Sequence, residues 1–194
     1  MGYSDEAIIQ MMNKHKRGVY GSIEDEICIR GKKICFRQDA LFDNKMSVML
    51  PDNFEDMSPE AAKSKYPMEQ RPQVIKTSED TKINFTFSLI EQPITNEQVE
   101  ELVKYIKKIL RNAKPDIRFV EDKIQEVDKL TIGWFDFVSN GYDQKIYNLM
   151  YYLPIDGKVM HGIFNCPLQD ADVWKTIILQ VIQTIREIRE GESN

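Results

Sequence analysis

The sequence has little of what most catalytic and cofactor-binding sites are built from. It contains two histidines, three cysteines and nine glycines in 194 residues. Two histidines are too few for a multi-histidine metal centre, and an odd number of cysteines is typical of reduced thiols. The glycines form neither a G-x-x-x-x-G-K-[ST] nor a G-x-G-x-x-G motif, which excludes nucleotide binding by those two routes. We therefore expect no cofactor and no metal, and we favour a protein that is not an enzyme.

Long apolar runs and a dense basic surface are also missing. No window approaches the roughly 18 apolar residues of a membrane span, and the first residues are acidic where a secretory signal is basic. The net charge is −5, from 26 basic and 31 acidic residues, which argues against affinity for nucleic-acid phosphates. The sequence therefore predicts a cytoplasmic protein with neither a nucleic-acid nor a membrane partner.

The composition that remains is that of an ordinary globular domain, with 42% hydrophobic and 29% charged residues. Residues 1–20 are expected to contain a separate amphipathic helix, because Ile8, Met11 and Met12 recur at helical spacing and Gly18 follows a cationic end. Residues 21–194 are expected to form a single α+β domain.

Two later segments have the apolar periodicity of helices. In residues 95–111 a capping box of Thr95 and Gln98 precedes the apolar stripe, and Asp170 caps a second helix. The first stripe consists of Val99, Leu102, Val103, Ile106, Ile109 and Leu110. The second consists of Trp174, Ile177, Ile178, Val181, Ile182, Ile185 and Ile188. We expect both stripes to pack against a sheet.

An early hairpin brings two cysteines close together. A two-residue turn at Gly31-Lys32 would place Cys28 opposite Cys35. At a hydrogen-bonded position their Cβ atoms would lie about 5.5 Å apart, which is too far for an unstrained disulfide. We interpret both as structural thiols.

Two further turns, at residues 140–141 and 156–157, define a meander of antiparallel strands. The opposite pairs counted from these turns include Trp134 with Tyr147, Asp136 with Lys145, and Tyr152 with His161. One face of the meander is strongly apolar and contains Leu130, Ile132, Trp134, Leu149, Tyr151 and Phe164. The other, which we call the mixed face, contains Phe135, Phe137, Ile146, Met150, Ile163, Thr131, Gly133, Gln144, Asn148, Tyr152 and His161. Since both faces need cover, we expect an antiparallel sheet of about six to nine strands with helices on both sides.

A set of short motifs completes the pattern: Met49-Leu50-Pro51, Phe54, Met57, Tyr66-Pro67, Arg71-Pro72 and Phe85-Thr86-Phe87. With these motifs, the order of helix, three strands, helix, two strands, helix, four strands and helix resembles the Mog/PsbP-like fold. The likeness covers roughly residues 26–190 and looks closest to small uncharacterised bacterial members. The resemblance implies an α+β sandwich that serves as a non-catalytic accessory or binding module.

Two places are candidates for binding. Asn148, Tyr152 and His161 on the mixed face could line a small pocket beside Gly133, although the more ordinary alternative is that a covering helix buries them. The segment from Tyr66 to Arg71, held by flanking prolines, suits contacts with a protein or is simply a stiff connector. Our main hypothesis is a protein-binding module that is a monomer or weak homodimer. The alternative is a small-ligand-binding protein or an unrecognised hydrolase that uses the mixed face around His161.

Overall fold

The computed structural model of the protein describes residues 19–29, 31–67, 71–141 and 143–189. Most of the helix predicted for residues 1–20 therefore lies outside the described residues. Its last two residues form a short strand, β1 (Val19–Tyr20), which pairs with β2 (Ile27–Ile29).

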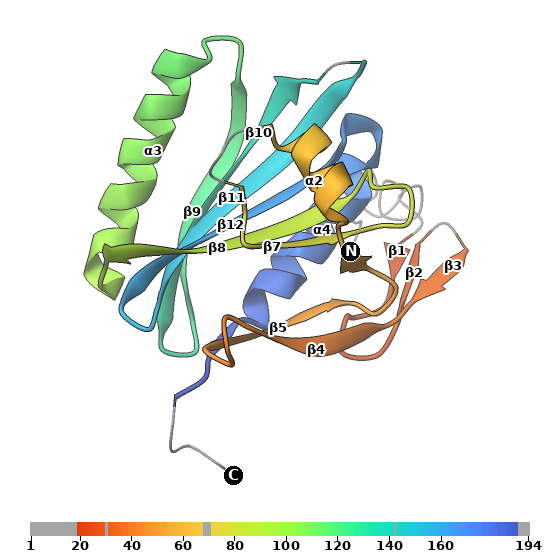
Figure 1. The fold of residues 1–194 in the computed structure, drawn as a ribbon, viewed down its shortest axis with the longest axis horizontal. Coiled ribbons are helices and arrows are strands. Elements are labelled where there is room, and N and C mark those ends of the chain that lie inside the picture. The colour runs from red at the N-terminus through yellow and green to blue at the C-terminus, as the bar shows by residue number, and fades with distance from the viewer. Residues whose placement is uncertain (1–18, 30, 68–70, 142, 190–194) are drawn as a thin grey trace, which may run out of the picture.

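A seven-stranded antiparallel sheet forms the centre of the molecule (Figure 1). Its strands, in spatial order, are β6 (Glu55–Asp56), β7 (Val74–Thr77), β8 (Asn84–Pro93), β12 (Lys158–Pro167), β11 (Lys145–Ile155), β10 (Leu130–Asn140) and β9 (Arg118–Val127). Helices α2 (Pro59–Lys65) and α3 (Val99–Ala113) lie in front of this sheet in Figure 1, and α4 (Ala171–Gln183) lies behind it. The predicted α+β class, with helices on both faces of an antiparallel sheet, is confirmed.

Two smaller sheets flank the large one. The first is formed by β1, β2 and β3 (Lys32–Ile34), and the second by β13 (Arg186–Glu187), β5 (Met46–Pro51) and β4 (Phe36–Leu41). The largest core cluster joins the strongly apolar face of the seven-stranded sheet to α4 and β5. A second cluster joins the mixed face to α3. The predicted assignment of apolar side chains to two faces is therefore correct.

The predicted register at residues 140–141 is wrong by four residues. Trp134 pairs with Tyr151 rather than with Tyr147, and Asp136 pairs with Leu149 rather than with Lys145. The connection is a loop over residues 141–144 and not a two-residue turn. The backbone N–H of Gly141 donates to the carbonyl oxygen of Gln144 (2.8 Å) and closes this loop. Because four is an even number, every side chain stays on its predicted face. The register from the turn at 156–157, which pairs Tyr152 with His161, is confirmed.

The early hairpin also differs from its predicted register. Cys28 lies opposite Lys33, and the exposed Cys35 follows the end of β3. Lys32, which was expected in the turn, instead begins β3 opposite Ile29, and Gly31, at φ +82°, directly precedes it. The two cysteines therefore do not face each other.

Both long helices differ slightly from their predicted ranges. Thr95 donates its backbone N–H to Gln98 Oε1 (2.9 Å), as the capping box predicts, but the first turn is a 3-10 helix, η1 (Asn96–Gln98). A second 3-10 turn, η2 (Leu168–Asp170), precedes α4, which ends at Gln183 rather than near Ile188. The chain leaves the helix there because Thr184 Oγ1 accepts the N–H of Met49 on β5 (2.9 Å) and the following residues form β13.

Candidate functional site

Helix α3 covers the part of the mixed face that belongs to β9, β10 and β11. A Cβ at Gly133 would lie 2.6 Å from Val103 Cγ2 and 2.8 Å from Ile124 Cδ1, so only a glycine lets the helix approach this closely. Phe135 and Phe137 are buried beneath the same helix. The predicted pocket beside Gly133 is therefore filled by packing.

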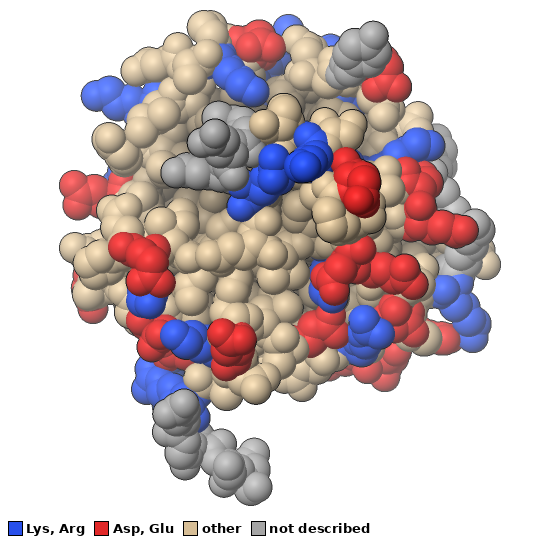
Figure 2. Space-filling model, viewed as in Figure 1, with Lys and Arg blue, Asp and Glu red and all other residues tan. Residues whose placement is uncertain are grey.

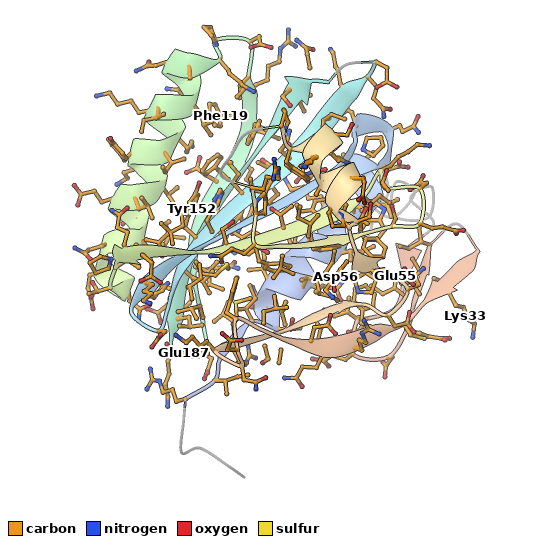
Figure 3. The ribbon with its side chains drawn as sticks, in the orientation of Figure 1. Lys33, Glu55, Asp56, Phe119, Tyr152 and Glu187 are labelled. Carbon is orange, nitrogen blue, oxygen red and sulfur yellow. The ribbon has the colours of Figure 1, made fainter. Side chains whose placement is uncertain are left out.

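Tyr152 and His161 form a stacked pair at the boundary of this covered region. Their ring centroids are 4.6 Å apart and the ring planes differ by 1°. Tyr152 is 4% exposed and packs beside α3 (Figure 3), whereas His161 is half-buried. The two residues are direct cross-strand partners, as predicted from the turn at residues 156–157.

Burial controls the chemistry of the pair. It lowers the pKa of His161 to about 4 and raises the pKa of Tyr152, so both rings are uncharged near neutral pH. Nε2 of His161 is buried and has no hydrogen-bond partner among the described residues. A buried nitrogen without a hydrogen bond is costly, so we expect the hydrogen-bond partner of Nε2 to be a group other than the described residues.

Asn148 lies further along the mixed face. It pairs with Phe137, not with Gly133 as predicted, because of the four-residue register shift. Its Nδ2 donates to Ser139 Oγ (3.0 Å) and its cross-strand neighbour on β12 is Asn165. Asn148 is therefore separated from the stacked rings by one row of residue pairs.

A row of polar side chains crosses four strands at this level. Thr77 on β7 donates to Asn84 Oδ1 (2.8 Å), and Asn84 Nδ2 donates to Asn165 Oδ1 (2.9 Å). Asn165 Nδ2 in turn reaches the hydroxyl of Tyr66 (3.4 Å), and Asn148 is the last residue of the row. Sequence reasoning missed this row, and its only signal was an asparagine near one end of β8 and of β12.

The second predicted candidate region reaches the same face. Tyr66 is the C-cap residue of α2, and Arg71 Nε donates to its carbonyl oxygen (2.9 Å) while the Arg71 side chain is exposed. Residues 68–70 between them lie outside the described residues. Two candidate regions that are distant in the sequence are thus linked through Asn165 on one side of the sheet.

No hydrogen bond joins His161 to the residue opposite it on β8, Ser88. A nucleophile and its base need to lie within hydrogen-bond reach, and a base with a pKa near 4 is poorly matched to neutral pH. The geometry therefore gives no support to a Ser–His hydrolase at this position. Within the described part of the chain, no group of three or more His, Cys, Asp or Glu side chains could hold a metal ion.

A buried ionic cluster, also missed by sequence reasoning, lies on the opposite face. The fully buried carboxylate of Asp136 accepts hydrogen bonds from Tyr147 Oη (2.8 Å), Lys175 Nζ (2.6 Å) and the N–H of Glu121 (2.7 Å). A bulge in β9 opposite Asp136 exposes that N–H. Burial lowers the pKa of Lys175, but its hydrogen bonds to Asp136 and Glu121 produce a net rise. The carboxylate has a partner on each oxygen, so we interpret the cluster as the attachment of α4 to the sheet.

The arrangement of these elements defines a PsbP-like α+β fold, as the sequence resemblance implied. The solution structure of cyanobacterial PsbP (CyanoP) from Synechocystis sp. PCC 6803 matches with a TM-score of 0.60 at 10% identity, over 79% of this chain and 92% of that one. LpqN, involved in cell envelope biogenesis of Mycobacterium tuberculosis, matches with a TM-score of 0.53 at 8% identity, over 80% and 92% of the two chains.

A protein from Bacteroides thetaiotaomicron matches with a TM-score of 0.53 at 9% identity, over 81% of this chain and 50% of that one. At such identities the likeness establishes the fold alone. No family model and no curated protein matches the sequence. Among the described helices, none is both long and apolar enough to cross a membrane.

Proposed function

We propose that the protein is a non-catalytic accessory module that binds another protein through the part of the mixed face between α3 and Tyr66. We call this surface the contact strip. The observation that carries the proposal is that half-buried polar and apolar side chains from three neighbouring strands gather there. The strip consists of Ser88, Asn148, Met150, His161, Ile163 and Asn165.

The chemistry of the strip supports contact with a protein. Met150 and Ile163 offer apolar area, while the amides of Asn148 and Asn165 and the hydroxyl of Ser88 offer hydrogen bonds. Interfaces combine an apolar centre with polar groups and are enriched in Tyr, Met and Arg, and both Tyr66 and Arg71 lie at one end. Figure 2 shows a largely uncharged area on this side of the molecule, between groups of charged residues. We keep a cytoplasmic location and a monomeric or weakly dimeric state as parts of the proposal.

The proposal is tested by comparing variants in a capture experiment. Ser88→Arg and Arg71→Glu place bulk or reversed charge at the strip, and Ser64→Arg and Lys63→Glu make the same changes on the exposed side of α2. Immobilised proteins are incubated with a lysate of the source organism, and retained proteins are quantified by mass spectrometry. We expect a protein retained by the wild type and by the α2 variants to be reduced about tenfold by each strip variant. Equal retention by all five proteins contradicts the proposal.

A second candidate function is binding of a small neutral ligand, and the unpaired Nε2 of His161 favours it. The chain has only two histidines, so the ring nitrogens of His161 can be resolved by 15N NMR with His15 as an internal reference. The probes are phenol and N-methylacetamide, which offer an O–H and an N–H donor. A change at Nε2 of His161 alone, at millimolar probe concentration, supports a ligand site. Unchanged nitrogen shifts argue against it.

A further inference from the structure

A small hollow lies where the end of β8 meets the start of α3. Lys158 pairs with Pro93 but Val159 pairs with Ile90, so the two residues between Ile90 and Pro93 are opposite no residue of β12 in the strand pairing. This irregularity is a β-bulge close to the end of β8, and the chain continues from there into α3. The result is a hollow of about 250 Å3.

The walls of the hollow are apolar and its rim is polar. Pro93, Ile94, Leu102, Tyr105 and Val159 supply the apolar lining. Tyr105 is 60% exposed and Ile90, beside Val159, is 41% exposed, so apolar area at the hollow is accessible to a partner. Gln92, Gln98 and Glu101 complete the lining. An apolar centre within a polar rim is the anatomy of an interface anchor site.

The hollow adjoins the contact strip. Val159 precedes His161 by two residues on β12, so both side chains lie on the mixed face. Ile90 and Ser88 are related in the same way on β8, opposite Val159 and His161. A partner segment lying along the strip would therefore pass the mouth of the hollow.

Size and charge indicate what the hollow accepts. Pockets for cofactors and drug-sized ligands occupy roughly 300–1,000 Å3, so a volume of about 250 Å3 suits a single side chain. Glu101 is on the rim, and the lining contains neither Lys nor Arg. The nearest strand lysine, Lys158, is paired with Glu91 (2.8 Å), and alternation along β12 places it on the other face from Val159.

We propose that the hollow binds one apolar side chain of the partner protein that is adjacent to a Lys or Arg in the partner's sequence. The apolar side chain fills the space lined by Leu102 and Val159, and the cationic neighbour lies against Glu101. This inference rests on the proposed function, because it names the chemistry that the partner presents to one end of the contact strip.

The recognition is tested with short blocked peptides and the full chain. The probes are N-acetyl-Leu-Arg-amide, N-acetyl-Leu-Glu-amide and N-acetyl-Ala-Arg-amide, and the readout is the 13C-methyl NMR signals of Ile94, Leu102 and Val159. We expect the first peptide to bind best, since only it offers both groups. Equal effects of all three peptides, or none from any, overturn the inference.

Matched variants separate the two contacts. Tyr105→Ala removes a wall of the hollow, and Ile109→Ala removes a side chain of the same helix that is 42% exposed and outside the lining. We expect Tyr105→Ala to weaken Leu-Arg binding about tenfold and Ile109→Ala to leave it unchanged. Glu101→Gln should reduce the preference for Leu-Arg over Leu-Glu about twofold or more, while Glu60→Gln on α2 should not.

The capture experiment distinguishes failure of this inference from failure of the proposed function. If Tyr105→Ala lowers partner retention as the strip variants do, the inference is supported. If the strip variants release the partner but Tyr105→Ala retains it fully, the anchor site is wrong and the contact strip stands. If neither set of variants changes retention, both are wrong.

Discussion

At the scale of single residues, His161 links stability to pH. Its pKa is about 4 in the folded protein, whereas an unfolded histidine titrates near pH 6.5. Between these values the unfolded chain binds more protons, so the free energy of unfolding falls as the pH is lowered from about 6.5 to about 4. The difference between the two pKa values corresponds to about 3.4 kcal/mol at most, and partial exposure of the ring reduces this to about 1–3 kcal/mol.

The measurement is urea unfolding of the wild type and His161→Gln at neutral pH and near pH 4.5. Both proteins contain the same carboxylates. If the difference between their free energies of unfolding changes from one pH to the other, that change is therefore due to His161. We expect the variant to lose less stability on acidification, while His15→Gln follows the wild type. Parallel loss in all three proteins shows that His161 is not held neutral by burial.

Gly162 is required because its backbone lies directly against the side chain of Tyr151. A Cβ there would lie 2.0 Å from Cζ of the buried Tyr151 ring. We expect Gly162→Ala to lower the free energy of unfolding by about 1–3 kcal/mol, since the ring cannot move without disturbing the core. In a Tyr151→Leu background the same change should cost less, and chemical denaturation of the four proteins measures the coupling. An equal cost in both backgrounds contradicts this explanation.

At the scale of elements, the ionic cluster attaches α4 to the seven-stranded sheet. Lys175→Met leaves the fully buried carboxylate of Asp136 without its cation, which we expect to lower the free energy of unfolding by about 3–5 kcal/mol. The control is Lys104→Met, which breaks an exposed ion pair with Glu100 within α3 and should cost less than about 1 kcal/mol. Similar losses for both variants in thermal or urea unfolding would show that the buried ion pair contributes no more to the free energy of unfolding than the exposed one.

The elements themselves were largely predictable, but their registers were less so. The stripe that begins at Val99 and the cap at Thr95 follow from local periodicity, which is why α3 was anticipated closely. Strand pairing depends instead on loop length, and a loop over residues 141–144 cannot be told from a two-residue turn by its sequence alone. The faces remained correct only because the error was an even number of residues.

The candidate site depends on contacts between distant parts of the chain, which local sequence patterns do not predict. Tyr152 and His161 were found together because a short turn fixes their pairing. That α3 would pack on Gly133, and that Tyr66 would reach Asn165 from 99 positions away, depends on where distant elements meet. Sequence patterns therefore select the face of the sheet, and tertiary packing decides which part of it stays open.

At the scale of the whole molecule, the two sheets that contain β5 and β10 share one core. Val48 on β5 is fully buried in the same cluster as Trp134 on β10 and Trp174 on α4. If residues 21–194 form one domain, as the sequence predicts, a cavity at Val48 destabilises the large sheet as much as the small one. We expect Val48→Ala to lower the free energy of unfolding by about 2 kcal/mol, equally by tryptophan fluorescence and by far-UV circular dichroism.

The control for this last variant is Gln38→Ala, an exposed change on the neighbouring strand β4, which should shift neither signal by more than about 0.5 kcal/mol. The fluorescence of Trp134 and Trp174 reports the large sheet and α4, whereas circular dichroism reports every strand. A dichroism curve that splits into two transitions, with the fluorescence midpoint unchanged, would mean that the small sheet unfolds on its own. Coincident shifts of the two signals would mean that α4 couples both sheets into one cooperative unit. The residues of the contact strip would then keep their arrangement only while the whole domain is folded.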